Sequence, residues 1–491
     1  MSLISTIGSL FSSKSANTPD IIQMDKIAEL INTSPEALKK FEESYKSMAL
    51  DVQDNDLFSV NSRQASSEKQ AIQPDKTDEI IPSEEVEKKL QELCSRIVDE
   101  LLSETQVYTY DGKHSSYQSA GYLPKDYKYI TSEDLSTIPY PLRPELSGNL
   151  MKIDLQGPSF PLVLQSYKQF LEETNSQKKR QLYGHFRQGL DIVDLDEIVY
   201  KIIEQNKNSM GFWLPMLVNA VNNTDGTLFK IPKTKVASVP LPLLQLTRLD
   251  YNSLHESTID IVDSWAYKAF NLDESKDYFI KTGTYSSKFD FRNAKVSTPQ
   301  EVRELGEYLL YIHFQALQMA GHLCSRPTFG VSTTTDWVVR EYIHDSEDNP
   351  CIYKGLPLHT EYRVFIDCDS KQVLGYTPYW DPETMLHRFS QGADSNSPHN
   401  KHDYVIYKSH EPKLMERYSN NIGKVISAVE ELIPNLDLPG QWSLDIMQNG
   451  SDFWLIDMAL AEASAFYDHV PKNLRKPMKE DWIPKLENFN H

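Results

Sequence analysis

Two lysines flank a loop of small hydroxyl residues in the stretch YFIKTGTYSSKFDF, residues 278–291. Lys281 ends a short apolar run that predicts a β-strand, and Lys288 follows the loop. The loop contains Thr282, Gly283, Thr284, Ser286 and Ser287. Backbone amides and hydroxyls in such a loop can surround an anion, while lysines supply positive charge. The stretch is therefore either a phosphate-binding loop or an ordinary surface turn, and Lys288 either contacts phosphate or lies in solvent.

Two aspartates in the last apolar segment, QWSLDIMQNGSDFWLIDMA, are candidate metal ligands. The Asn449-Gly450 pair predicts a hairpin turn between two strands. A two-residue loop would direct Asp445 and Asp457 to opposite faces of the hairpin. A three-residue loop, 449–451, places them on one face as diagonal neighbours, about 7–8 Å apart. Two carboxylates at this spacing suit Mg²⁺, which prefers oxygen ligands.

The apolar residues of this hairpin favour the three-residue loop. That register pairs Gln448 with Asp452 and collects six large apolar side chains on the other face: Trp442, Leu444, Ile446, Trp454, Ile456 and Met458. Burying each side chain stabilises the fold by roughly 1.5–3 kcal/mol, so we expect this register. The alternative, that Asp445 and Asp457 are two solvated strand aspartates, stays open.

A well-marked helix is predicted directly after the lysine loop, over residues 299–321. Thr298 has the type of an N-cap residue, Pro299 suits the first helical position, and Glu301 completes a capping box. Gly321 is a typical helix stop. This helix would hold the preceding strand and loop in place.

The remaining elements near the chemistry are mainly strands. Residues 337–343 read as a buried strand, and residues 361–367 and 372–380 read as a β-hairpin. The polar segment 390–402 is expected to be a mobile loop. Residues 414–433 are expected to form a helix before the last hairpin.

The first half of the chain carries no assignable chemistry. A helix is predicted within residues 32–50, and the polar residues 51–82 read as a flexible linker. A second amphipathic helix is predicted over residues 83–104. Residues 105–270 show a mixed α/β pattern that is rich in tyrosine and proline.

Composition limits the partners that we expect. The chain of 491 residues is long enough for two or three folded units, and its net charge of -20 disfavours nucleic acid and anionic membranes as partners. Its four cysteines lack the CxxC spacing of zinc sites and fit a reducing cytoplasm. We read no signal peptide and no run of roughly 20 apolar residues, the length of a membrane span. A cytoplasmic protein is expected.

The order of these segments resembles the ATP-grasp superfamily. Over roughly residues 275–470 the chain contains, in this order, a strand lysine with a small-residue loop, a helix, the strand VVREYI, an arginine-bearing strand and an acidic hairpin. KTGTYSSKFDF, REYI and EYRVFI resemble the clade in which arginine replaces the second nucleotide-binding lysine. The EYRVF segment is also similar to that of the eukaryotic cell-division-cycle assembly chaperones of translation initiation factor two.

The resemblance implies ATP and Mg²⁺ as cofactors and gives roles to individual residues. Lys281 and Arg363 would be the catalytic cations, with Arg363 facing the γ-phosphate. The other nucleotide contacts would come from Thr282, Gly283, Thr284, Ser286, Ser287, Lys288, Arg340, Glu341, Tyr342 and Ile343. In this set Arg340 stands in for the second lysine, and residues 341–343 form the adenine and ribose hinge. Asp445 and Asp457 would bind the metal.

One position departs from the family pattern. The family ends this hairpin with an acidic residue, a spacer and an asparagine, whereas Asp457-Met458 is followed here by Ala459. A usual metal ligand is therefore missing. Either Glu462 compensates, or one Mg²⁺ is bound, or catalysis is lost; surface solvation is the alternative for Glu462.

The expected fold class is α+β, an ATP-grasp-like fold at residues 271–475. The rest of the chain is expected to comprise a helical N-terminal segment at 1–50, the linker at 51–82, an upstream mixed α/β region at 83–270 and a tail at 476–491. The implied function is an ATP- and Mg²⁺-dependent ligase, in which a carboxylate becomes an acyl phosphate that an amine attacks. The carboxylate and amine substrates are not identified by the sequence, and a peptide or a protein is one option. The oligomeric state also stays open. The alternatives are an ATP-binding assembly chaperone without turnover and a phosphotransferase or nucleotidyltransferase.

Overall fold

The structure is a computed structural model that combines helices with antiparallel sheets, which confirms the α+β class. It describes residues 36, 82–146, 163, 167, 169–193, 195–321, 330–391 and 397–476. Apart from Glu36 and Pro82, the predicted N-terminal helix and linker lie outside the described residues. The predicted tail also lies outside them, except for Lys476.

A six-stranded sheet, sheet A, has the strand order β2-β1-β4-β7-β5-β6, and all its neighbouring strands are antiparallel. Its strands are β1 (Gln106–Tyr110), β2 (Ser115–Ser119), β4 (Thr234–Ser238), β5 (Tyr278–Thr282), β6 (Lys295–Val296) and β7 (Asp336–Glu341). The lysine strand β5 and the arginine strand β7 are therefore direct neighbours, although more than fifty residues separate them in the chain.

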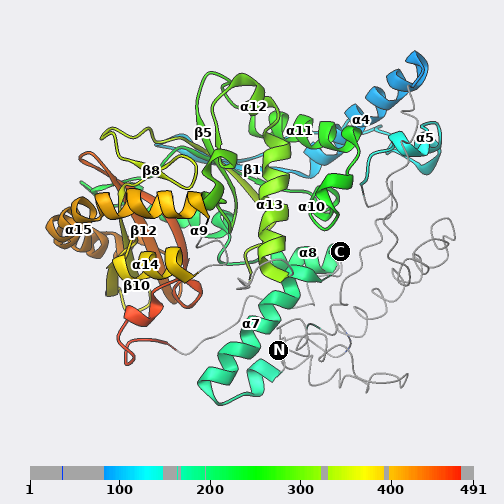
Figure 1. The fold of residues 1–491 in the computed structure, drawn as a ribbon. Coiled ribbons are helices and arrows are strands. Elements are labelled where there is room, and N and C mark those ends of the chain that lie inside the picture. Colours follow the sequence, from blue (N-terminus) through cyan, green and yellow to red (C-terminus); the bar gives the residue numbers. More distant parts are fainter. Residues whose placement is uncertain are drawn as a thin grey trace.

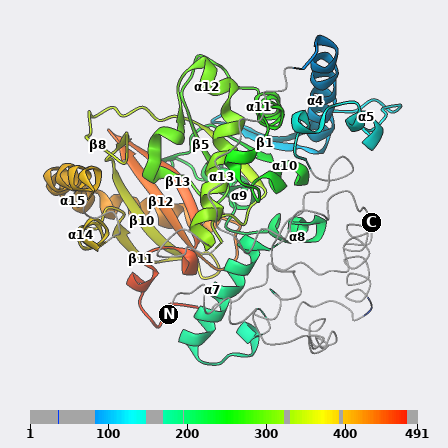
Figure 2. The ribbon, with the colours of Figure 1, turned by 45° about the vertical axis from the view of Figure 1, so that its right-hand side comes forward.

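A five-stranded sheet, sheet B, has the order β11-β10-β12-β13-β3. Its strands are β3 (Phe229–Lys230), β10 (Thr360–Asp367), β11 (Gln372–Pro378), β12 (Gln441–Asn449) and β13 (Asp452–Leu460). Only the β13–β3 pair is parallel. Both predicted hairpins, β10–β11 and β12–β13, are present and lie side by side (Figure 2). A separate pair consists of β8 (Cys351–Ile352) and β9 (Leu356–Pro357).

Helices cover both sheets (Figure 1). Their bounds are α4 (Glu84–Glu104), α5 (Ser132–Ser136), α7 (Ser176–Ile192), α8 (Glu197–Ile203), α9 (Met210–Asn222), α10 (Leu241–Leu246), α11 (Glu256–Phe270), α12 (Pro299–Arg303), α13 (Leu305–Gly321), α14 (Pro382–Gln391) and α15 (Pro398–Leu432). α11 packs between α4 and α13 and contacts β4, whereas α15 packs on β10 and β11.

Two hydrophobic cores follow from the alternation of side chains along the strands of sheet A. On β7, Trp337 and Val339 enter a core shared with Trp265 of α11 and with α13. Val338 points the other way, into a second core formed with α9 and sheet B. Arg340 lies two residues after Val338, so it projects on the side of sheet B.

Two helical predictions need correction. The predicted helix 299–321 has the expected capping box at Thr298, but Glu304 leaves helical geometry and divides it into α12 and α13. The polar segment 390–402 is not a simple loop, because α14 ends at Gln391 and α15 begins at Pro398. Only residues 392–396 between them lie outside the described residues.

The last hairpin has neither of the registers considered from the sequence. Asn449 pairs with Asp452 across the loop Gly450–Ser451, and a β-bulge inserts Ile456 so that Asp445 lies directly opposite Asp457. The core-facing residues of β13 are consequently Phe453, Leu455 and Met458 rather than Trp454, Ile456 and Met458. The bulge turns Asp457 onto the same face as Asp445, directly opposite it and not diagonal to it.

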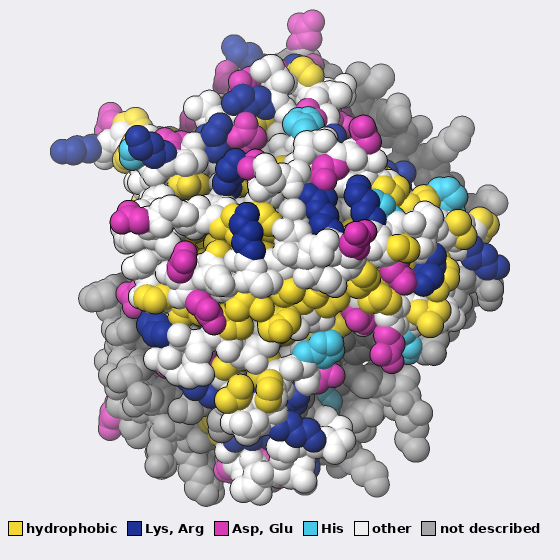
Figure 3. Space-filling view, turned by 90° about the vertical axis from the view of Figure 1, so that its left-hand side faces the viewer, with side chains coloured by type: hydrophobic (Ala, Val, Ile, Leu, Met, Phe, Trp, Pro, Cys, Tyr) yellow, Lys and Arg dark blue, Asp and Glu magenta, His cyan; other side chains and the backbone are white. Residues whose placement is uncertain are grey.

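Among the described residues, no helix combines the length and apolar character that crossing a bilayer requires. Figure 3 shows the side of the molecule that carries α15, where hydrophobic side chains form a band across the middle of the face. Exposed apolar residues of this region include Leu386 of α14 and Val405 of α15.

Candidate functional site

A cleft with an empty volume of about 920 Å³ lies between sheet A and sheet B. β5 and β7 of sheet A and β10, β12 and β13 of sheet B contribute lining residues to it. The cleft therefore gathers candidate residues from three separate segments of the sequence: Lys281, Lys288, Arg340, Asp445 and Asp457.

Strand alternation explains why cations from sheet A reach this cleft. On β5, Ile280 faces the helical core, so its neighbours Phe279 and Lys281 project to the opposite side. Phe279 pairs directly with Arg340 of β7. The lysine and the arginine thus enter one cleft from neighbouring strands, the arrangement that the family resemblance implied.

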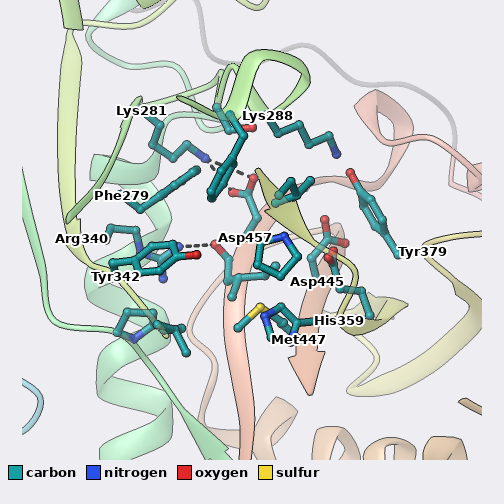
Figure 4. Close-up of a pocket in the computed structure, with 18 of the residues that line it drawn as sticks. Phe279, Lys281, Lys288, Arg340, Tyr342, His359, Tyr379, Asp445, Met447 and Asp457 are labelled. Atoms are coloured by element: carbon teal, nitrogen blue, oxygen red, sulfur yellow. Dashed lines mark hydrogen bonds and ion pairs between the residues drawn. The ribbon is translucent and has the colours of Figure 1, made fainter. Parts of the chain in front are cut away.

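Four charges form a row at the cleft, of which Lys281, Asp445 and Asp457 line it and Arg363 does not. Arg363 of β10 lies opposite Asp445 of β12, which lies opposite Asp457 of β13. Arg363 donates two hydrogen bonds to Asp445, at 2.7 Å and 2.6 Å, and Lys281 approaches Asp457 at 3.2 Å from sheet A. The charges along the row are positive, negative, negative and positive, so they balance within the protein. Figure 4 shows three members of the row, Lys281, Asp457 and Asp445. Burial lowers the pKa of Arg363, but the Asp445 carboxylate outweighs this effect and the net shift is upward.

Arg340 is bound to the bulge rather than to a carboxylate. Its guanidinium donates hydrogen bonds to the backbone carbonyls of Leu455 and Ile456, and its Nε has no hydrogen-bond partner among the described residues. Burial lowers the pKa of Arg340 to about 10, while Asp457 opposes that shift. A buried guanidinium that satisfies only part of its donor set retains capacity for an anion in the cleft.

One end of the cleft is apolar and carries the predicted hinge. Phe279, Tyr342 and Met447 line it together with Glu341 and Ile343. The Glu341 side chain turns back to Lys233, at 2.9 Å, and the N–H groups of Glu341 and Tyr342 donate to backbone carbonyls. This end offers aromatic and aliphatic surface beside strand-end backbone, which suits a flat heterocycle.

The loop after Lys281 is mostly turned into the protein. Thr282 accepts hydrogen bonds from the amides of Thr284 and Tyr285, and the amide of Gly283 donates to Asp336. The hydroxyls of Thr284 and Ser287 bind Val331 and Gln315, respectively. Of the five predicted loop residues, only Ser286 lines the cleft, so the loop contributes fewer phosphate contacts than its composition suggests.

The other end of the cleft holds Lys288 and Glu361. The Lys288 ammonium lies 4.2 Å from the ring centroid of Tyr379, and Arg363 lies 4.8 Å from the same centroid. Burial lowers the pKa of Lys288, with Glu361 opposing that shift. Burial raises the pKa of Glu361; Lys288 opposes this rise and Asp445 adds to it. The charged form of each group is therefore energetically disfavoured in the described structure.

The predicted metal ligands do not all meet. Asp445 and Asp457 line the cleft, but Glu462 lies on a 3₁₀ turn, Ala461–Ala463, and does not line it. Among the described residues, the one group of three metal-binding side chains with ligand atoms within 4.8 Å of each other is Asp345, Glu347 and His359.

We assign no metal to that second group. Glu347 is already bound by the guanidinium of Arg417, at 2.6 Å and 2.5 Å, and this contact lowers the pKa of Glu347 against the opposing effect of burial. Lys413 donates to the neighbouring Asn349. A cation would meet two positive charges there.

Sequence reasoning missed Glu361, Tyr379 and Trp380, which line the cleft. A signal for Glu361 was present, because it lies two residues before Arg363 on one predicted strand and therefore shares its face. Tyr379 follows β11, and its amide donates to the Glu361 carbonyl. Only the pairing of β10 with β11 brings its ring to the cleft.

Comparisons with known proteins add little to this geometry. No protein-family model and no curated protein matches the chain. Matches among solved structures include Cdc123 from Schizosaccharomyces pombe, with a TM-score of 0.32 and 13% identity, covering 56% of this chain and 95% of that chain. A C-terminally truncated Cdc123 from the same organism matches with a TM-score of 0.31 and 12% identity, covering 57% and 95%. TM-scores this low carry neither fold nor function to this chain.

Proposed function

We propose that the cleft binds ATP with Mg²⁺ and that the chain is an ATP-dependent ligase of the ATP-grasp type. The observation that carries this proposal is the convergence of Lys281, Arg340 and two paired aspartates beside an apolar hinge in one cleft.

The donor set fits both ligands chemically. Phosphate oxygens would take the place of Asp457 on Lys281 and use the free donor capacity of Arg340. The Asp457 carboxylate would then be available to Mg²⁺, and Asp445 would offer it the lone pairs that Arg363 leaves open. Mg²⁺ would supply charge neutralisation on the phosphates. Lys281 and Arg363 would offset the negative charge that builds up as a carboxylate approaches the γ-phosphate.

The test separates nucleotide binding from turnover. We expect Lys281→Met to weaken ATP binding by about 10- to 100-fold, since it removes a charge-assisted contact of about 1.5–3 kcal/mol. Lys276→Met, which changes an exposed lysine outside the cleft, is the matched control. Asp457→Asn should keep most of the binding and lose turnover. Calorimetry with an ATP analogue and analysis of nucleotide products measure the two effects; unchanged affinity in Lys281→Met would refute the proposal.

A second candidate function is an ATP-binding assembly chaperone. Ala459 favours it, because the side chain cannot supply the amide oxygen that the ATP-grasp pattern places there. ADP and phosphate with a joined product support the ligase, whereas ATP binding without turnover supports the chaperone. Formation of AMP or pyrophosphate would instead support nucleotidyl transfer.

A further inference from the structure

The end of the cleft around Tyr379 contains two charges that the protein leaves unpaired. Among the described residues, Lys288 donates no hydrogen bond and has no carboxylate within ion-pair distance, although its ammonium rests on the Tyr379 ring at 4.2 Å. Glu361 is only 9% exposed and has no cation of the described residues within that distance, although Lys288 and the Trp380 side chain oppose the rise of its pKa that burial causes. Unpaired buried charges are unfavourable unless a ligand completes them.

These charges differ from those proposed to hold the nucleotide. Lys281 and Lys288 lie on opposite sides of Asp457 in the cleft (Figure 4). The positive charge of Arg363 is engaged by Asp445, so Lys288 is the cation left for a ligand at this end. A triphosphate alone does not account for Glu361, because a buried carboxylate repels a polyanion.

The surroundings hold the two side chains rigidly. Glu361 is fixed on β10, between β11 and β12. Trp380 donates its indole N–H to the His359 carbonyl at 3.0 Å, and its own carbonyl accepts from the Tyr407 hydroxyl at 2.9 Å. The ligand would meet a preformed wall of Tyr379 and Trp380 with one positive and one negative group beside it.

We propose that this end binds the amine substrate, and that the substrate is a small zwitterion: an α-amino acid whose ammonium faces Glu361 and whose carboxylate faces Lys288. The inference rests on the proposed function. Glu361 takes one proton from the ammonium, and the neutral nitrogen attacks the acyl phosphate. A C–N bond forms as the C–O bond to phosphate breaks, and the second proton leaves with the phosphate. A carboxyl group with a raised pKa suits such proton transfer.

The experiment uses the full chain saturated with a non-hydrolysable ATP analogue and Mg²⁺. Each of the twenty amino acids is titrated singly by calorimetry, and the tightest binder is compared with its decarboxylated amine and its des-amino acid. We expect each single-charge analogue to bind at least 10-fold more weakly. Glu361→Gln should weaken the amino acid at least 10-fold and leave the des-amino acid unchanged, while Lys288→Met should leave the decarboxylated amine unchanged.

Two controls make a failure interpretable. Glu383→Gln on α14, an exposed site, should change none of these affinities, and thermal unfolding checks that each variant folds. The inference is overturned if the ATP analogue binds but none of the amino acids does, or if the single-charge analogues bind as tightly as the amino acid. Either result leaves nucleotide binding intact. Absence of nucleotide binding refutes the proposed function itself.

Discussion

The two ends of the cleft treat buried charge differently. In the row formed by Arg363, Asp445, Asp457 and Lys281, each carboxylate has a cationic partner. At the Tyr379 end, neither Lys288 nor Glu361 forms an ion pair with a described residue, although each is the charge that most affects the pKa of the other. Paired charges support the fold without a ligand, whereas unpaired charges reduce stability in exchange for binding.

This contrast predicts that two mutations, each removing one carboxylate, change the free energy of unfolding in opposite directions. Removing a member of the row should destabilise the chain, because its partner is left uncompensated. Removing a charge at the Tyr379 end should stabilise the chain, because an unfavourable burial disappears. Stability measurements can therefore test the comparison without any knowledge of the substrate.

The largest effect is expected for Asp445→Asn. The Arg363 and Asp445 side chains are 12% and 10% exposed, so the variant leaves a buried guanidinium without its anion. We expect the free energy of unfolding to fall by about 3 kcal/mol. Urea unfolding measures this change, with Asp437→Asn at an exposed site as the control. A loss no larger than that of the control would contradict the pairing.

A smaller effect of opposite sign is expected for Glu361→Gln. The pKa of Glu361 is raised above 4.5 in the folded state, so folding favours the protonated form. The stability that the protonated Glu361 side chain contributes is fully present below pH 4.5 and is lost as pH rises through the folded-state pKa.

The glutamine variant should consequently match the wild type at pH 4 and exceed it by about 1 kcal/mol at pH 8. Urea unfolding at both pH values provides the measurement, and Glu383→Gln should show no such pH-dependent difference. Equal stabilities at pH 8 would show that Glu361 is better compensated than the geometry indicates.

The smallest effect is expected for the affinity of the last hairpin for Mg²⁺, after a change at Ala459. Ala459 lies opposite Ser443, two residues beyond Asp457. Ala459→Asn restores the amide of the ATP-grasp pattern and should tighten Mg²⁺ binding in the presence of an ATP analogue by about 1 kcal/mol. Calorimetric titration with Mg²⁺ measures it, and Ala463→Asn, at an exposed site, is the control. Equal Mg²⁺ affinity in the two variants would argue against a metal beside this hairpin.

Local sequence signals predicted much of the fold. The Thr298–Glu301 capping box marks a helix start that the structure shows, and the strands predicted at Lys281 and Arg340 are present as β5 and β7. These features depend on residues within a few positions of each other, which a single sequence displays directly.

Features set by distant contacts were missed. α15 continues through Pro412, a residue that usually ends helices, because Tyr407 and Leu414 on either side are buried in one core. The bulge at Ile456 depends on Arg340, more than a hundred residues earlier, which binds the carbonyls of Leu455 and Ile456. Glu361 looked like an ordinary strand residue until β10 was placed between β11 and β12.

The bulge also constrains how the hairpin can change length. Ile456 is the extra residue of β13, so its deletion would restore regular alternation and leave the aspartate after it on the face of Asp445. What the deletion would remove is the Ile456 carbonyl that Arg340 binds. A related chain that is one residue shorter at this point can therefore keep its acidic pair, but its arginine needs another acceptor.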